Sequence, residues 1–446
     1  MASLKQALAL GVYSTLMRAL WPLLYLRFQR RARREPIYGE ALAERYGFYT
    51  GKPPPDAERP LWLHAVSLGE TRAAEPLIKA LREARPELRL LLTHGTATGR
   101  ETGRALLRPG DQQRWLPIDS PGAVRRFLAW HRPLAGVLME TEVWPNLQQA
   151  ARAAGVPMLL ANARLSPKSL RQSLRFDALL RPAAQTITKA LAQTAGDAER
   201  LRQAGAPDVQ VCGNLKFDMS PEPALLQRGQ AWRAAAGVRP VVLAASWREG
   251  EDAPLLSAWR EQLAAAQPSA VRPLLLLVPR HPQRFDEVAG LIEQAGLSLS
   301  RRSRWGAPGV DVIPDPQACA ADVWLGDSMR EMPAYYATAD VALLGGSFAP
   351  LGGQNLIEAA ACGCPVVMGP HTFNFAEAAE LAEAQGAARR VATLTEGVAQ
   401  ALALATDAPA EQAAVEAARQ YAGAHRGAAE RMARAVLAAA GLSKPC

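Results

Sequence analysis

Acidic side chains stand where apolar segments of this chain end, and their positions suggest acid–base chemistry. The segment HAVSLGE, residues 64–70, closes the first strand expected after the N-terminus and places Glu70 near the start of the following helix. The helix dipole stabilises an anion there, and an ionised carboxylate can act as a general base. The same spacing also fits a glutamate that only stabilises the helix N-terminus.

More polar groups follow later strands of the same half. Glu140 and Glu142 lie in METEVWPN directly after an apolar run, NARLS at residues 162–166 follows the next run, and Lys216 lies in GNLKFD. In parallel α/β sheets, ligands bind beside the carboxyl ends of the strands. We therefore expect acid, amide and basic groups along one edge of one sheet.

A serine hydrolase is an alternative interpretation of the first segment. Ala65, Ser67 and Gly69 are one residue away from the G-x-S-x-G turn that exposes the nucleophile of such enzymes. That turn follows several strands and an oxyanion loop, whereas this segment ends the first strand. The hydrolase is therefore the weaker hypothesis.

The second half of the chain carries groups suited to a nucleotide. PRHP contains Arg280, whose planar fork can bind phosphate, and His281, which could equally be structural. Glycine pairs at 345–346 and 352–353 flank a strand–helix junction, where backbone N–H groups and a helix N-terminus attract anions. Glu358 could accept hydrogen bonds from ribose hydroxyls. These features predict a nucleotide site in this half.

Signatures of metal-dependent chemistry are missing from the sequence. It has no D-x-D triplet, no H-E-x-x-H and no G-x-x-x-x-G-K-[ST]. The five cysteines form no C-x-x-C pair, and Cys362 and Cys364 are more typical of core packing than of a metal site. We expect no metal, no other cofactor and a reducing, cytoplasmic compartment.

The N-terminus combines an apolar segment with positive charge. Residues 7–28 approach the length that spans a bilayer, although Arg18 interrupts them. Charges that follow the apolar segment are not in the order of a signal peptide, and positive flanks stay cytoplasmic. We expect an anchor that spans the membrane or lies on anionic headgroups; a helix packed on the protein's own core is the alternative. The flanking arginines are Arg27, Arg30, Arg31, Arg33 and Arg34.

The formal net charge of +9 favours anionic partners without choosing among them. Because the arginines cluster beside an apolar segment instead of spreading over a face with aromatic residues, we expect no nucleic acid partner.

A β/α alternation begins after the basic run and restarts beyond the turn-rich FDMSPEP at residues 217–223. Short apolar runs between helical stretches predict parallel sheets covered on both faces. We predict an α/β fold of two Rossmann-like, doubly wound domains facing a cleft, with an anchor at 1–34, one domain at 35–218 and another at 219–446. The expected strands are 61–66, 88–93, 134–139, 156–161, 209–212, 240–245, 274–278, 322–325, 341–344 and 365–368.

These ordered segments resemble the 3-deoxy-D-manno-octulosonic acid (Kdo) transferases of lipopolysaccharide biosynthesis, which are GT-B glycosyltransferases. The resemblance covers nearly the whole chain and is carried by RYGFY, SLGE, METEVWPN, NARLS, GNLKFD, PRHP, GDSM, GGS, GGQNLIE and MGPHTFNF. It implies an inverting enzyme that is located at the cell inner membrane and has the anionic lipids of that membrane as partners. Such an enzyme moves Kdo from CMP-Kdo, held mainly by the C-terminal domain, to a lipid A precursor, lipid IV(A), held mainly by the N-terminal domain.

The resemblance also implies roles for single residues. Glu70 matches the catalytic base, and Glu140 and Lys216 match groups that stabilise the transition state. Family members often have glycine at the position of Arg330, so a backbone contact could survive there while the role of the side chain stays open. The positions that match the CMP-contacting segments are Arg280, His281, Met329, Arg330, Glu331, Asn355, Leu356, Ile357 and Glu358.

Two other functions are compatible with this fold. One is a GT-B transferase that uses another nucleotide sugar on a lipid acceptor. The other is a non-catalytic membrane-bound adaptor, which would be free to lose Glu70 and the segment 354–358, yet both are present.

Overall fold

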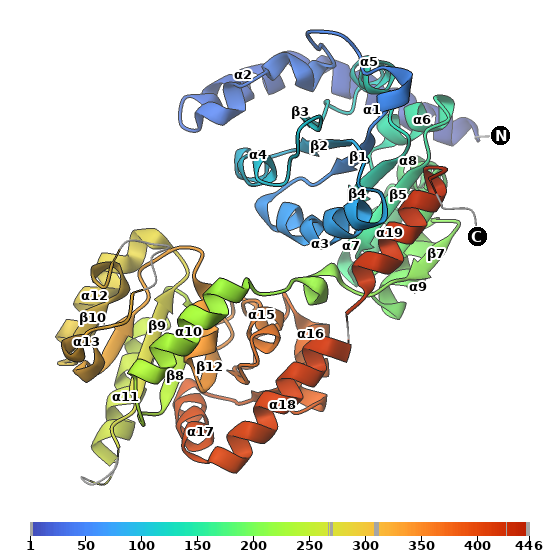
Figure 1. Cartoon of the computed structure of the whole chain (residues 1–446). Coiled ribbons are helices and arrows are strands. Elements are labelled where there is room, and N and C mark those ends of the chain that lie inside the picture. Colours follow the sequence, from blue (N-terminus) through green and yellow to red (C-terminus); the bar gives the residue numbers. More distant parts are fainter. Residues whose placement is uncertain (1–2, 266, 268–270, 307–311, 425, 443–446) are drawn as a thin grey trace. The chain divides into compact units, whose positions relative to one another are not determined.

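The computed structural model describes residues 3–265, 267, 271–306, 312–424 and 426–442. Within these residues the chain forms two compact units (Figure 1). The first unit runs to Asp218 and is completed by the segment that begins at Arg426, and the second unit begins at Met219. The predicted domain 219–446 therefore extends too far, because the last helix, α19 (Ala428–Ala439), contributes its apolar side to the core of the first unit.

The described part of the first unit contains a parallel sheet of seven strands in the order β3-β2-β1-β4-β5-β6-β7. Successive strands run outward from β1 on one side and from β4 on the other. The crevice between the carboxyl ends of β1 and β4 is therefore the switch point at which such sheets bind ligands. The strands are β1 (Leu61–His64), β2 (Leu90–His94), β3 (Gln112–Trp115), β4 (Gly136–Met139), β5 (Met158–Ala163), β6 (Lys189–Ala192) and β7 (Val209–Val211).

Helices cover both faces of this sheet. Apolar residues of α3 and α19 pack on one face, and those of α5, α6 and α9 pack on the other, which buries the strands on both sides. The helices are α3 (Leu68–Ala84), α4 (Ala97–Arg104), α5 (Pro121–His131), α6 (Pro145–Ala153), α7 (Pro167–Arg175), α8 (Asp177–Ala184) and α9 (Ala195–Ala204), and the 3-10 turns are η1 (Pro36–Gly39), η2 (Leu42–Tyr46), η3 (Asp56–Glu58) and η4 (Leu215–Asp218).

The apolar N-terminal segment forms two helices, α1 (Leu4–Ala19) and α2 (Trp21–Ala32), instead of the single helix that was predicted. Pro22 lies in the first turn of α2, where a proline is tolerated, and the two helices are bent by 48°. Among the described residues, no single helix is long and apolar enough to cross a membrane. Taken together, the bent pair α1 and α2 has the length and composition of a membrane span, and no other property supports a span.

The described part of the second unit contains another parallel sheet of seven strands, in the order β10-β11-β9-β8-β12-β13-β14. Its switch point lies between β8 and β12. The strands are β8 (Val241–Trp247), β9 (Leu274–Pro279), β10 (Leu299–Arg301), β11 (Val323–Leu325), β12 (Val341–Leu344), β13 (Val366–Met368) and β14 (Ala388–Arg390).

Apolar residues of α11, α12 and α17 form the core on one face of this second sheet. The helices are α10 (Pro223–Ala235), α11 (Asp252–Ala265), α12 (Phe285–Gln294), α13 (Pro316–Ala320), α14 (Met332–Thr338), α15 (Leu356–Ala361), α16 (Ala376–Ala384), α17 (Leu394–Thr406) and α18 (Ala408–Ala424), with 3-10 turns η5 (Pro282–Arg284) and η6 (Arg302–Arg304).

Candidate active site

Glu70 lies in the first turn of α3, directly beyond the carboxyl end of β1. Ser67 begins this helix, since its hydroxyl accepts a hydrogen bond from the backbone N–H of Glu70. The Glu70 carboxylate in turn accepts the N–H of Val66 at 2.7 Å and the hydroxyl of Ser67 at 3.2 Å. These bonds cap the helix and fix the half-buried carboxylate at the switch point of the first sheet.

The acidity of Glu70 separates it from an ordinary capping residue. Its pKa is raised from 4.5 to about 7. Burial is the largest cause, the charges of Glu140 and Glu142 add to it, and the hydrogen bonds from the Val66 N–H and the Ser67 hydroxyl act against it. The sequence predicts an anion stabilised by the helix dipole, and this expectation is wrong in its direction, because desolvation and two carboxylates outweigh that stabilisation. A carboxyl group that titrates near neutral pH is suited to general base catalysis.

Glu140 stands across the switch point, directly after β4. Its backbone has a φ of 57°, a left-handed conformation that is unfavourable for a residue other than glycine, and its N–H donates to Ala161 at 2.9 Å. Strained residues of this kind gather at functional sites. Burial and the charge of Glu140 also raise the pKa of Glu142. Two carboxyl groups thus act electrostatically on Glu70 from the neighbouring strand.

Lys216 belongs to the same edge of the first sheet. The pKa of Lys216 is lowered, mainly by burial and also by the positive charge of Arg164. The negative charge of Glu140 acts in the opposite direction and raises this pKa. The buried Asn162, which follows the apolar run of β5, holds this turn by accepting the N–H of Leu215 on its side-chain oxygen at 3.0 Å. The first unit therefore brings Glu70, Glu140 and Lys216 into one electrostatic neighbourhood.

The hydrolase alternative finds no support in this geometry. Ser67 is hydrogen bonded to Glu70, and among the described residues no histidine is hydrogen bonded to the Ser67 hydroxyl. The buried His64 and His94 contact Thr93 and Ala65, and burial lowers their pKa values to about 3 and about 4. Gly69 also makes no tight turn, since it lies inside α3 and a Cβ there would meet only Ser67 Oγ, at 3.9 Å.

In the second unit, Arg280 and His281 follow β9. The side chain of Arg280 is exposed. Its backbone N–H donates to the carbonyl of Trp247 at the end of β8. His281 is partly exposed, with its Nε2 at 3.9 Å from the Glu249 carboxylate. Both side chains lie at the carboxyl edge of the second sheet, next to its switch point.

The segment after β11 divides into exposed and buried residues. The side chain of Met329 is exposed, and Arg330 has a φ of 66°, which is the conformation that glycine adopts most easily. Glu331 is buried and forms 3.0 Å ion pairs with Arg228 and Arg302. The carboxylate of Glu331 is therefore paired with two arginines of the protein itself, which fixes the position of this segment.

The segment 355–358 forms the beginning of α15. The side chain of Asn355 caps the helix by accepting the N–H of Ile357 at 3.2 Å. Leu356 and Ile357 are buried in the core, so only their backbone can contact a ligand, whereas Glu358 is partly exposed in the first turn.

The first glycine pair does not offer its backbone N–H groups to a ligand, contrary to the prediction. The N–H of Gly345 donates to Ala245, and that of Gly346 donates to the carboxylate of Glu251 at 2.7 Å. Glu251, which is 2% exposed, also accepts the N–H groups of Phe348 and Ala349. A side chain of the protein thus occupies the anion-binding concavity of this loop.

The sequence interpretation did not single out Glu251. Its signal in the sequence was weak: an acidic residue six positions after the expected strand 240–245, followed by a helical stretch. Only the fold reveals that its partners lie about a hundred residues later. Across the residues that the structure covers, no group of three or more His, Cys, Asp or Glu side chains is arranged to hold a metal ion.

Two doubly wound units with ligand-binding edges define the GT-B class of fold. A UDP-GlcNAc 2-epimerase from Neisseria meningitidis, solved bound to UDP-GlcNAc, matches 85% of this chain and 98% of its own, with a TM-score of 0.55 and 16% identity. That likeness concerns the fold alone, and the predicted Rossmann-like α/β architecture is confirmed.

Sequence comparison narrows the class to one family. The family model described as 3-deoxy-D-manno-octulosonic-acid transferase (kdotransferase) matches residues 40–219. The 3-deoxy-D-manno-octulosonic acid transferase of Bordetella pertussis is 51% identical over 428 residues, which are 94% of this chain and 97% of that protein. The enzyme of the same name from Haemophilus influenzae is 36% identical, over 84% of this chain and 85% of its own. This chain therefore belongs to the 3-deoxy-D-manno-octulosonic acid transferase family, and the predicted resemblance is confirmed.

Proposed function

We propose that this protein is an inverting glycosyltransferase that transfers Kdo from CMP-Kdo to the glucosamine disaccharide of a lipid A precursor, lipid IV(A). Membership of the family supports the transferase activity and the sugar. The observation that carries the mechanism is Glu70, a fixed carboxyl group with a pKa of about 7 at the switch point of the first sheet. The choice of lipid IV(A) as acceptor and of CMP-Kdo as donor extends this proposal beyond the family name.

In this proposal Glu70 takes the proton from a hydroxyl group of the acceptor glucosamine. The hydroxyl oxygen attacks the anomeric carbon of Kdo, and the bond from that carbon to the CMP phosphate breaks. CMP leaves with the electron pair, and the configuration at the anomeric carbon inverts. A carboxylate base of matched acidity contributes roughly 10²- to 10⁴-fold to the rate of such a step.

The developing negative charge needs positive partners, and the chain supplies them from its own residues. Lys216 carries a partly desolvated ammonium group, and desolvation strengthens its interaction with charge. Glu140 holds Lys216 in its charged form, since its charge raises the lysine pKa. We assign the CMP group to the second unit, with Arg280 and His281 at the phosphate and the backbone of segments 329–331 and 355–358 around the nucleoside.

We also propose that the protein works at the cytoplasmic face of the inner membrane, on anionic lipids. The supporting observation is the exposed apolar stripe of α1, formed by Leu4, Leu8, Val12 and Leu16, which are 88%, 68%, 63% and 53% exposed. The next helix, α2, carries Arg30 and Arg31 in its last turn, and apolar area combined with positive charge is the pattern of helices that bind anionic membranes.

Mass spectrometry of the lipid products tests the proposed function. The full chain is incubated with tetraacylated lipid A precursor and either CMP-Kdo or a UDP-sugar, with and without a metal chelator. We expect a lipid product heavier by Kdo when CMP-Kdo is the donor and no product when a UDP-sugar is the donor. The yield from CMP-Kdo should be the same with and without the chelator. Transfer from a UDP-sugar would favour the alternative transferase, and no transfer from any donor would favour the non-catalytic adaptor.

A further inference from the structure

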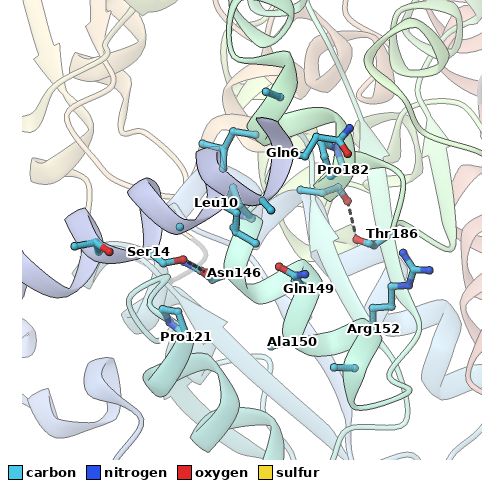
Figure 2. A pocket seen from close by; sticks show the side chains of 18 of the residues that line it. Gln6, Leu10, Ser14, Pro121, Asn146, Gln149, Ala150, Arg152, Pro182 and Thr186 are labelled. Atoms are coloured by element: carbon cyan, nitrogen blue, oxygen red, sulfur yellow. Dashed lines mark hydrogen bonds between the residues drawn. The ribbon is translucent and has the colours of Figure 1, made fainter. Parts of the chain in front are cut away.

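The N-terminal helix α1 is tethered to the first unit but does not pack tightly on it. Tyr13 Oη donates to Asp119 Oδ2 at 2.9 Å, and Ser14 Oγ donates to Asn146 Oδ1 at 2.7 Å. However, no residue of α1 is buried. Between α1 and helices α6 and α8 lies a groove with a volume of about 680 Å³ (Figure 2). This volume lies within the range of small-molecule binding sites.

The groove combines an apolar lining with positive charge. Small and apolar side chains of α6 and α8 line it, among them Ala150, Leu179 and Pro182, and Leu10 faces it from α1. Its charged lining residues are all arginines, with no aspartate or glutamate among them. The three arginines, which are all exposed, are Arg18 of α1, Arg125 of α5 and Arg152 of α6.

A ligand that is apolar at one end and anionic at the other satisfies both features. A small soluble anion would leave the apolar lining in water, and a neutral hydrocarbon would leave three arginines without a counter-charge. The groove and the exposed apolar stripe are built on the same helix, since different residues of α1 line the groove and form the stripe. The lipid surface that we assign to the outer side of α1 would therefore present such amphiphiles at the groove.

We propose that the groove under α1 binds one acyl chain of an anionic glycerophospholipid, with the phosphate at Arg18, Arg125 and Arg152. This inference depends on the proposed location at a membrane and adds a specific lipid site to it. Bound lipid would fill the space between α1 and α6 and bury apolar surface that α1 alone leaves exposed, which favours the docked helix. The tethers at Tyr13 and Ser14 would hold the groove open until a lipid enters.

Photolabelling in vesicles tests this site. The full chain is bound to phosphatidylcholine vesicles that contain a minor fraction of phosphatidylglycerol with a diazirine in its acyl chain, or the same probe built on phosphatidylcholine. After irradiation, peptide mass spectrometry locates the label. Arg152→Glu reverses one charge at the groove, Ala150→Trp fills the groove, and Arg171→Glu changes an exposed arginine of α7 outside it as the matched control.

We expect label from the phosphatidylglycerol probe on the groove sides of α6 and α8. It should fall at least about fivefold in Arg152→Glu, since each arginine near an anionic lipid contributes about that factor. It should fall in Ala150→Trp and stay unchanged in Arg171→Glu. Equal labelling by both probes, no label on α6 and α8, or labelling that neither groove variant lowers would overturn the proposal.

Sedimentation of the same samples keeps this result separate from the membrane location. If the protein sediments with vesicles but carries no label in the groove, the proposed lipid site is ruled out and the proposed membrane location stands. Protein that does not sediment would remove both, while Kdo transfer to detergent-dispersed acceptor would still report on the proposed enzyme activity.

Discussion

Among the single residues of this protein, Glu70 has two tasks that oppose each other. Its carboxylate caps α3 through Val66 and Ser67, which favours the ionised form, while burial and the carboxylates of Glu140 and Glu142 favour the protonated form. Its position in the first helical turn could be predicted from SLGE. Its pKa could not, because burial and two carboxylates from another strand arise only when the sheet is assembled.

The acidity of Glu70 should be visible in the pH dependence of transfer. The rate should rise with pH through about 7, because the base must lose its proton before it acts. Glu142→Gln removes a negative charge that raises this pKa, so the rising limb should move to lower pH while the rate at high pH changes little. Rates from pH 5.5 to 9 measure this. Glu75→Gln, an exposed change on the same helix, is the control; an unmoved limb in Glu142→Gln would contradict the assignment.

In the second unit, the neighbouring residues Arg330 and Glu331 differ in what the sequence reveals about them. Arg330 stands in a left-handed conformation, which accounts for the glycine expected there in related sequences. Glu331, which the resemblance places in a CMP-contacting segment, is buried and paired with Arg228 and Arg302. The sequence shows no sign of this pairing, since Arg228 lies about a hundred residues earlier.

Among the elements, most inner strands were predictable, but the inner strand β6 was missed, and so were most edge strands. The apolar runs at β1, β4, β8, β9 and β12 are buried on both faces and therefore stand out in the sequence. The strands β3, β10 and β14 lie at sheet edges, and their sequences QQRW, LSR and ARR are largely polar. Half-exposed edges need less apolar sequence, so periodicity alone misses them.

The loop after β12 should depend on Glu251. Glu251→Gln replaces an acceptor oxygen by an N–H donor, which would face backbone N–H groups of Gly346, Phe348 or Ala349. An unsatisfied buried group costs about 1–3 kcal/mol, so the free energy of unfolding should fall by that amount. Because this loop adjoins the switch point of the second sheet, KM for CMP-Kdo should rise more than kcat falls.

Steady-state kinetics and denaturant unfolding check these effects. Glu251→Asp should restore part of the donor affinity. Glu261→Gln, an exposed change on α11, the helix that begins directly after Glu251, should have no effect. A variant that loses stability while KM for CMP-Kdo stays unchanged would show that the loop has no part in donor binding.

For the molecule as a whole, the exposed stripe of α1 should decide where the enzyme works. The double variant Leu8→Glu and Leu16→Glu changes only exposed side chains, so its thermal stability should match the wild type. Each buried leucine contributes about 1.5–3 kcal/mol to apolar transfer, so vesicle binding should fall more than about tenfold. Val238→Glu, at an exposed apolar residue of the second unit, serves as the control in the same sedimentation assay. Undiminished binding by the double variant would rule out this stripe as the membrane contact.

The division of the chain was only partly open to prediction. The turn-rich segment 217–223 marks the passage to the second unit, and the structure divides at Asp218. The return of α19 to the first unit could not be seen, because its Ala-rich sequence resembles the neighbouring α17 and α18. Its apolar contacts with α3 and the hydrogen bonds from the N–H groups of Gly427 and Ala429 to the Asp218 carboxylate assign it to the first unit.

Replacing the Glu70 carboxylate tests the account most directly. Glu70→Gln keeps an acceptor for the Val66 N–H, so the variant should fold. It should be at least as stable as the wild type at pH 8. Because the pKa of Glu70 is about 7 in the folded protein against an ordinary 4.5, the wild type loses stability as the pH rises from 4.5 to about 7, and the full cost is present at pH 8.

The measurement is Kdo transfer by Glu70→Gln and wild type side by side at pH 8, with CMP-Kdo binding followed by calorimetry. We predict unchanged CMP-Kdo affinity and a turnover lowered by about 10²- to 10⁴-fold. Turnover near the wild-type rate would remove Glu70 from the mechanism.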